Sequence, residues 1–201
     1  DVGISYGGCF TQLEYATDTF STFFQGSISN QYHQRFDFYQ YADQALIDGT
    51  SSQSTGEPLP AGIEPGTDSE KVNNFGYNAK AGFSYNPTSA HSFYANVGYY
   101  NRQPYHDNIY LNFTNQVNPL TENEKIFGLE AGYGFSSSQF SANINLYRTS
   151  WKDRVVTSSD VVDDVLTFET NFGTEQLHTG VEVDFKWRPV DGLSINGFAS
   201  V

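Results

Sequence analysis

Apolar and polar residues alternate along much of this chain, and the alternation comes in segments of about ten residues. In the clearest segment, one face consists of Phe127, Leu129, Ala131, Tyr133 and Phe135. Glycines and one carboxylate, Glu130, occupy the positions between them. A period of two predicts a β-strand with two unlike faces, and about ten residues is the length that a tilted strand needs to cross a bilayer. No apolar run approaches the roughly 20 residues of a spanning helix, so we expect any membrane crossing to be made by strands.

Further segments show the same alternation, which brings the predicted strands to about eight. They occupy residues 4–15, 20–41, 75–85, 93–100, 140–147, 179–187 and 193–201, and the first two are the least regular. Several polar faces carry charged residues: Lys80, Glu130, Glu182, Asp184 and Lys186. In a barrel these side chains would face the lumen. We expect them to hydrate the interior or to pair with an enclosed domain rather than to contact substrate.

The connections between these segments alternate in length. Short polar turns are predicted at residues 17–19, 86–90, 136–138 and 189–192, which are rich in turn-forming residues. Long connections lie between them, at residues 42–72, 102–124 and 156–174, and each is longer than the about two to five residues usual for a hairpin. Tight turns on one side and long loops on the other are typical of a membrane β-barrel, with the turns in the periplasm and the loops outside the cell.

We therefore predict an all-β fold, an antiparallel transmembrane β-barrel segment of about eight strands from a larger barrel. The composition agrees, because 14 Tyr and 17 Phe accompany a mean hydropathy of −0.48. Such a mixture is expected where one face meets lipid and the other meets a wet lumen. A soluble antiparallel sandwich also alternates and also uses hairpins, and it is the alternative fold. The glycine-rich polar faces and the regular alternation of short and long connections favour the barrel.

The chain contains no methionine and begins within a predicted strand. We expect residues 1–201 to form one partial barrel wall from a longer protein, with neither a plug domain nor an export signal among them.

Charge excludes nucleic acid as a partner, because the net charge is −13 and the pI about 4.4, whereas phosphate binding needs clustered Lys and Arg. Cys9 is the single cysteine and cannot form an internal disulfide, and we interpret it as a small apolar residue in a strand.

We predict no metal, no cofactor and no enzymatic activity. The histidines, His33, His91, His106 and His178, show none of the close spacings of a zinc site. The acidic first and third long connections could bind calcium, but they lack the repeated spacing of an EF-hand loop, so a solvated acidic surface is favoured. No nucleophile or enclosed cleft accompanies the paired carboxylates of the strands.

Residues 118–201 carry sequence landmarks in an order that resembles the barrel of TonB-dependent receptors. The landmarks are Asn-Pro-Leu-Thr-Glu-Asn-Glu-Lys at 118–125, Leu-Glu-Ala-Gly-Tyr at 129–133, Asn-Ile-Asn-Leu-Tyr at 143–147, Trp-Lys-Asp-Arg at 151–154 and Gly-Val-Glu-Val at 180–183, followed by Pro189 and Gly192. The resemblance implies a barrel of roughly 22 strands closed by a plug, of which this chain supplies part of the wall. It also implies the partners of such a receptor: outer-membrane lipid, its own plug domain, TonB through a region outside this chain, and a small-molecule or oligosaccharide ligand.

The second long connection is the candidate ligand site. It combines a cation, two phenols and an imidazole, a mixture suited to a polar, partly apolar ligand: Arg102, Tyr105, His106 and Tyr110. The alternative is that these rings belong to the aromatic girdle at the outer membrane interface.

Three functions remain open at this stage. The first is a receptor in the bacterial outer membrane that takes up a scarce nutrient such as an iron chelate (a siderophore), cobalamin or an oligosaccharide. The second is a passive porin-like barrel, which a plug domain preceding Asp1 would contradict. The third is a soluble sandwich that binds carbohydrate or protein, which a need for detergent would contradict.

Overall fold

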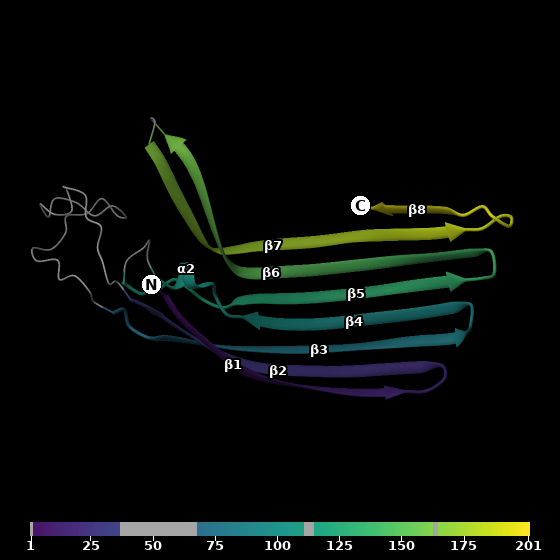
Figure 1. The fold of residues 1–201 in the computed structure, drawn as a ribbon, viewed down its shortest axis with the longest axis horizontal. Helices are drawn as coiled ribbons and strands as arrows, with labels where there is room; N and C mark the ends of the chain where they lie inside the picture. The colour runs from purple at the N-terminus through teal and green to yellow at the C-terminus, as the bar shows by residue number, and fades with distance from the viewer. Residues whose placement is uncertain (1, 37–67, 111–114, 163–164) are drawn as a thin grey trace, which may run out of the picture.

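The computed structural model describes residues 2–36, 68–110, 115–162 and 165–201, with only the backbone described at 157–162 and 165–169. These residues form one antiparallel sheet whose eight strands are hydrogen-bonded in sequence order (Figure 1). The strands are β1 (Val2–Ala16), β2 (Phe20–Arg35), β3 (Val72–Thr88), β4 (His91–Arg102), β5 (Glu124–Ser136), β6 (Phe140–Val162), β7 (Val165–Trp187) and β8 (Ile195–Ser200). One short helix, α2 (His106–Ile109), accompanies them in the described part. The predicted all-β fold is confirmed.

The register keeps the apolar residues of neighbouring strands on the same face. Phe83 pairs with Ala95, Ala95 with Ala131, and Ala131 with Leu146. A slip of one residue would turn every apolar side chain of a strand to the opposite face, so the alternation itself fixes this register.

The four predicted tight turns are confirmed, and two of them use the same chemistry. At the β1–β2 turn the amide of Thr17 donates to the carbonyl of Phe20 at 2.7 Å, and the amide of Phe20 donates to the Thr17 hydroxyl at 3.1 Å. Ser137 and Phe140 repeat both bonds at the β5–β6 turn, at 2.7 and 3.0 Å. A hydroxyl residue therefore closes each turn by mimicking a backbone turn.

The prediction of a third long connection at residues 156–174 is wrong. Strands β6 and β7 continue through it, and their pairing runs to Val162 and Val165. The register shifts between Trp151 and Arg154, where Asp153 has a φ of 58°. Figure 1 shows both strands bending away from the rest of the sheet beyond this bulge. The polar composition of residues 156–174 suggested a loop, but cross-strand backbone bonds do not depend on an apolar face.

Of the other two long connections, the second is described in larger part than the first. Residues 37–67 of the first lie outside the described part, and with them the predicted end of the second strand and most of the acidic cluster considered for calcium. The second connection contains α2 and an isolated bridge between Tyr110 and Val117.

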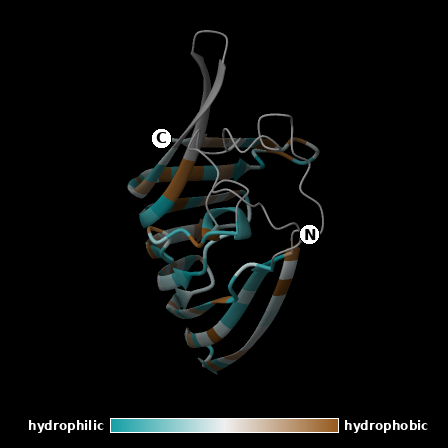
Figure 2. Ribbon diagram, turned by 90° about the vertical axis from the view of Figure 1, so that its left-hand side faces the viewer, coloured by the Kyte–Doolittle hydropathy of each residue, from teal (hydrophilic) through white to brown (hydrophobic). Residues whose placement is uncertain are grey.

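The sheet is curved into an arc, and α2 lies on its concave side (Figure 2). We call the side with Lys80, Glu130 and Glu182 the concave face and the side with Ala81, Leu129 and Val181 the convex face. The sheet is not closed, and β1 and β8 form its two edges. Only Ile109, Tyr110 and Ile126 are buried hydrophobic residues in the described part, so a single layer replaces the two packed layers that a sandwich requires. None of the described helices has the length and apolar character needed to cross a membrane.

Candidate functional site

The second long connection folds back over the concave face at the end of the strands opposite the tight turns. Ile109 and Tyr110 are 1% and 4% exposed. The Tyr110 hydroxyl lies within hydrogen-bond distance of the backbone carbonyls of His33 and Glu70, at 3.0 and 2.9 Å, and its one hydrogen is shared between them. The connection is therefore anchored to β2 and to the residues that precede β3.

Gln103 supplies a second anchor at the end of β4. Its side-chain amide donates to the Ser29 hydroxyl at 2.7 Å and to the carbonyls of Ser29 and Asn74 at 3.3 and 3.4 Å. The amide lies directly over Gly76, where an added Cβ would come within 2.5 Å of it. Gly76 thus provides the space that this side chain fills.

Two histidines 73 residues apart meet beneath the connection. The Nδ1 atoms of His33 and His106 lie 3.1 Å apart, and the His106 ring also packs on Tyr110. Burial, with Arg35 nearby, lowers the pKa of His106, although Asp107 opposes the shift. No close spacing in the sequence links these two histidines, because only the register of β2 against the folded connection brings them together.

A cluster of charged and aromatic side chains occupies the concave face beside this connection. Glu124 is almost buried, and Arg102 and Arg154 approach its two carboxylate oxygens at 3.3 and 3.7 Å. The guanidinium of Arg102 lies 4.6 Å from the ring centre of Tyr105, and that of Arg154 lies 5.0 Å from the ring centre of Trp151. We call these five residues the arginine cluster.

The arginine cluster has an excess of positive charge, since one carboxylate serves two guanidinium groups. Planar guanidinium groups hydrogen-bond carboxylates in a fork and stack on aromatic faces. Here one nitrogen of each arginine faces the buried carboxylate at ion-pair distance, and about a third of each arginine side chain remains exposed to a ligand.

The structure separates the four predicted ligand residues into two pairs. Arg102 and the exposed Tyr105 belong to the arginine cluster. His106 and Tyr110 instead pack the connection against β2. The sequence-based prediction missed Glu124, Trp151 and Arg154. Only Glu124 had a local signal, because Arg102 and Glu124 stand at the two ends of one connection and become direct partners in the β4–β5 register.

The five charged residues predicted to face a lumen all lie on the concave face. Three of them accept hydrogen bonds from asparagines on the neighbouring strand: Glu130 from Asn96 at 3.3 Å, Glu182 from Asn145 at 3.4 Å, and Asp184 from Asn143 at 3.0 Å. The ammonium of Lys80 lies 5.6 Å from the ring centre of Phe23. No contact is described for Lys186 beyond its pairing with Ser141 and Asn196. That these residues face a closed lumen stays a prediction.

Among the described residues, no group of three or more His, Cys, Asp or Glu side chains could hold a metal ion. Cys9 lies in β1, exposed, with a free thiol.

The convex face is a belt of exposed apolar side chains. Aromatic rings gather near the tight turns, where Tyr85, Phe93, Tyr133, Phe185 and Trp187 lie, and again toward the other end at Phe75, Tyr77, Tyr99 and Phe127. Small and branched residues such as Ala81, Val97 and Leu129 fill the space between. Two aromatic girdles around an apolar band are the lipid-facing surface of a membrane barrel.

The fold and its two faces therefore define the class of protein: part of the wall of an antiparallel membrane β-barrel. The chain belongs to the TonB dependent receptor-like β-barrel family, whose model matches residues 5–200.

Solved structures of membrane transport proteins have a similar fold. The copper transporter OprC is 12% identical in sequence, with a TM-score of 0.71, and the match covers 100% of this chain and 30% of the OprC chain. The closed form of the ferric-catecholate import receptor Fiu from K12 E. coli is 13% identical over 97% of this chain and 28% of its own, with a TM-score of 0.50. This chain thus spans about 30% of the length of such proteins. No curated protein matches it.

Proposed function

We propose that this chain is part of the barrel wall of a TonB-dependent transporter in the bacterial outer membrane, which takes up an anionic metal chelate. Family membership and the apolar convex face support the location and the class of activity. The observation that favours the ligand class is the arginine cluster on the concave face, which offers two guanidinium groups and two rings around one buried carboxylate.

An anionic, ring-rich chelate matches this cluster better than a neutral oligosaccharide does. The excess guanidinium charge attracts the anion, and Tyr105 and Trp151 offer apolar faces to the rings of the ligand. A ferric-catecholate receptor and a copper transporter are among the proteins of similar fold. The plug domain, TonB and the remaining strands belong to the rest of the proposed receptor.

Binding to the purified full-length receptor tests the ligand class. The probes are an anionic ferric tris-catecholate, a ferric trihydroxamate without net negative charge, and a linear maltooligosaccharide, with Kd measured by fluorescence quenching. We expect the tris-catecholate to bind most tightly, and Arg102→Gln and Arg154→Gln each to weaken it about tenfold, the loss expected for one charge-assisted hydrogen bond.

Lys186→Gln is the matched control, because it removes a concave-face cation near the tight turns, remote from the arginine cluster. Equal affinity for the oligosaccharide, or an unchanged Kd in the double arginine variant, would contradict the ligand class. Uptake of radioactive iron that continues in cells without TonB would contradict the transporter proposal itself.

A further inference from the structure

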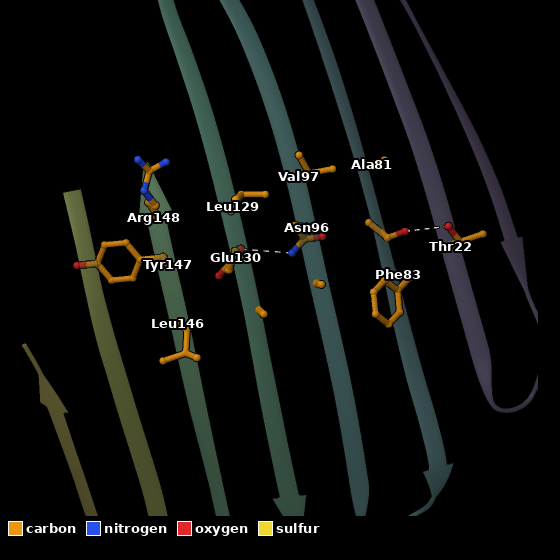
Figure 3. Close-up of a pocket in the computed structure, with 13 residues that line it drawn as sticks. Thr22, Ala81, Phe83, Asn96, Val97, Leu129, Glu130, Leu146, Tyr147 and Arg148 are labelled. Carbon is orange, nitrogen blue, oxygen red and sulfur yellow. Dashed lines mark hydrogen bonds between the residues drawn. The ribbon is translucent and has the colours of Figure 1, made fainter. Parts of the chain in front are cut away.

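The convex face carries a shallow apolar hollow of about 620 Å³ between its two aromatic girdles (Figure 3). It crosses five strands, from Thr22 on β2 to Arg148 on β6. Its floor is formed by small side chains, chiefly Ala81, Ala95 and Ala131, and larger residues flank it.

The hollow follows two neighbouring cross-strand rows of the sheet. One row is Ala81, Val97, Leu129 and Arg148, and the other is Phe83, Ala95, Ala131 and Leu146. Since adjacent strands are about 4.8 Å apart, the four spacings from β2 to β6 give a length of about 19 Å.

The hollow also rises through the membrane. Thr22 lies next to the β1–β2 turn, whereas Arg148 lies eight residues beyond Phe140, the first residue of β6. Eight residues span about 26 Å along a strand, which a tilt of about 40° reduces to roughly 20 Å along the membrane normal. The apolar band of such barrels is about 25 Å tall, so Arg148 lies near its loop-side edge.

Arg148 differs from the other cations near this edge of the convex face. Lys125 is paired with Asp153 at 2.6 Å, and Lys152 with Glu175 at 3.0 Å. Arg148 is exposed and has no carboxylate partner among the described residues. Its cross-strand neighbours are Leu129 and Thr179. An unpaired guanidinium beside hydrocarbon is costly unless it reaches an anion at the interface.

We propose that this hollow binds one phosphorylated, acylated lipid of the outer leaflet. Arg148 binds the phosphate of the headgroup, and an acyl chain lies along the alanine-floored hollow. Both the position of Arg148 at the loop side and its unneutralised charge select this occupant, because guanidinium groups recognise phosphate oxygens in a fork. The length of the hollow suits an acyl chain, since one leaflet of hydrocarbon is about 15 Å deep. This proposal depends on the proposed location of the chain in the outer membrane. It does not depend on which nutrient the receptor carries.

Native mass spectrometry of the full-length receptor tests the site. The receptor is stripped of lipid in detergent and titrated with diphosphoryl lipid A, with phosphatidylglycerol or with phosphatidylethanolamine. We expect one lipid A molecule to bind the wild-type receptor most tightly, and Arg148→Gln to weaken this binding about tenfold. Ala131→Leu fills the floor of the hollow and keeps the cation, and we expect it to weaken binding to a similar extent.

Lys152→Gln is the control, because it removes a convex-face cation that already has a carboxylate partner, and we expect lipid A binding to stay within about twofold. The heat-dependent gel mobility of each variant verifies that its barrel is folded. Unchanged lipid A binding in Arg148→Gln or in Ala131→Leu would overturn the proposed site. Equally tight phosphatidylethanolamine binding would overturn headgroup recognition, and tighter phosphatidylglycerol binding would overturn the assignment to the outer leaflet.

Discussion

At the scale of single residues, Gly76 decides where the second long connection lies. Replacing it with valine places side-chain atoms where the Gln103 amide now lies, so Gln103 must swing away and lose its bonds to Ser29 and Asn74. We expect amide exchange in residues 103–110 to become about tenfold faster, because roughly 1 to 1.5 kcal/mol of hydrogen bonding is lost.

The matched control for this change is Gly7→Val on β1, where an added Cβ meets nothing within 4 Å. Hydrogen–deuterium exchange of the purified receptor distinguishes the two variants. Equal exchange of residues 103–110 in both would show that Gln103 does not anchor the connection.

His106 makes the packing of the same connection depend on pH. Because burial lowers the pKa of His106 below its ordinary value of 6.5, the stability that its packing contributes is complete above pH 6.5 and declines as pH falls below it. Protonation of both facing rings would also set two N–H groups against each other across the 3.1 Å between His33 and His106.

We expect the protection of residues 105–110 from exchange to fall between pH 7.5 and 5.5, by up to about tenfold for each unit of pKa shift. The measurement is hydrogen exchange corrected for its intrinsic pH dependence. Burial also lowers the pKa of the facing His33, so the protection should vary less with pH in His106→Gln and should no longer vary in the His33→Gln, His106→Gln double variant. A flat profile in the wild-type receptor would contradict the prediction.

At the scale of elements, β6 and β7 are each 23 residues long and form a hairpin that extends past the apolar belt. The bulge at Asp153 lies where the hairpin leaves the sheet, and its left-handed backbone is rare for residues with side chains. Aspartate and asparagine tolerate this conformation better than other residues with a side chain. The bulge thus bends the hairpin and changes the direction of its outer half.

We expect Asp153→Val to destabilise the hairpin by about 1 to 2 kcal/mol, because a β-branched residue is strained in the left-handed region. Asp153→Asn keeps the backbone preference and removes only the half-exposed ion pair with Lys125, a loss of at most about 1 kcal/mol. Exchange rates of the paired amides between residues 154 and 174 report both changes. If the two variants behave alike, the bend does not depend on the conformation of residue 153.

Strand β1 departs from the pattern of the other strands. Its concave side carries Ile4, Tyr6 and Phe10, which are 54%, 71% and 76% exposed. The convex side of this part of the strand carries small residues, among them Gly7 and Cys9, whereas Leu13 and Tyr15 near the tight turn lie on the convex face as in the other strands. This reversal explains why the first segment alternates least clearly in the sequence. In the proposed receptor, a plug domain would cover these concave side chains.

At the scale of the whole molecule, the assignment of the two faces can be tested with the single cysteine. Cys9 pairs with Ile28 on the convex face, and the next residue, Phe10, pairs with Ser27 on the concave face. A fluorophore on Cys9 in the full-length receptor, with any other cysteines replaced by serine, should be quenched strongly by nitroxide-labelled lipid. A fluorophore on the thiol of the Cys9→Ser, Phe10→Cys variant should be quenched at least about threefold less, because successive side chains point to opposite faces.

Equal quenching at the two positions would contradict the assignment of the faces. A reversed order would mean that lipid covers the concave face, and the proposed transporter would then fail together with it.

The sequence alone determined the fold class, the tight turns, the number of strands and the division of each later strand into an apolar and a polar face. These features are local: period-two alternation and turn chemistry are complete within about ten residues. The landmarks in residues 118–201 pointed to the family that the match over residues 5–200 establishes.

Only the tertiary structure decided which distant residues meet. The strand register and the folded connection bring His33 to His106, join Gln103 to Gly76, and divide Arg102 and Tyr105 from His106 and Tyr110. Within the described part of the chain they also leave Arg148 without a carboxylate partner, whereas Lys125 and Lys152 each have one. The physical reason is that such contacts depend on the register summed across several strands and on the path of a long connection, neither of which a local pattern encodes.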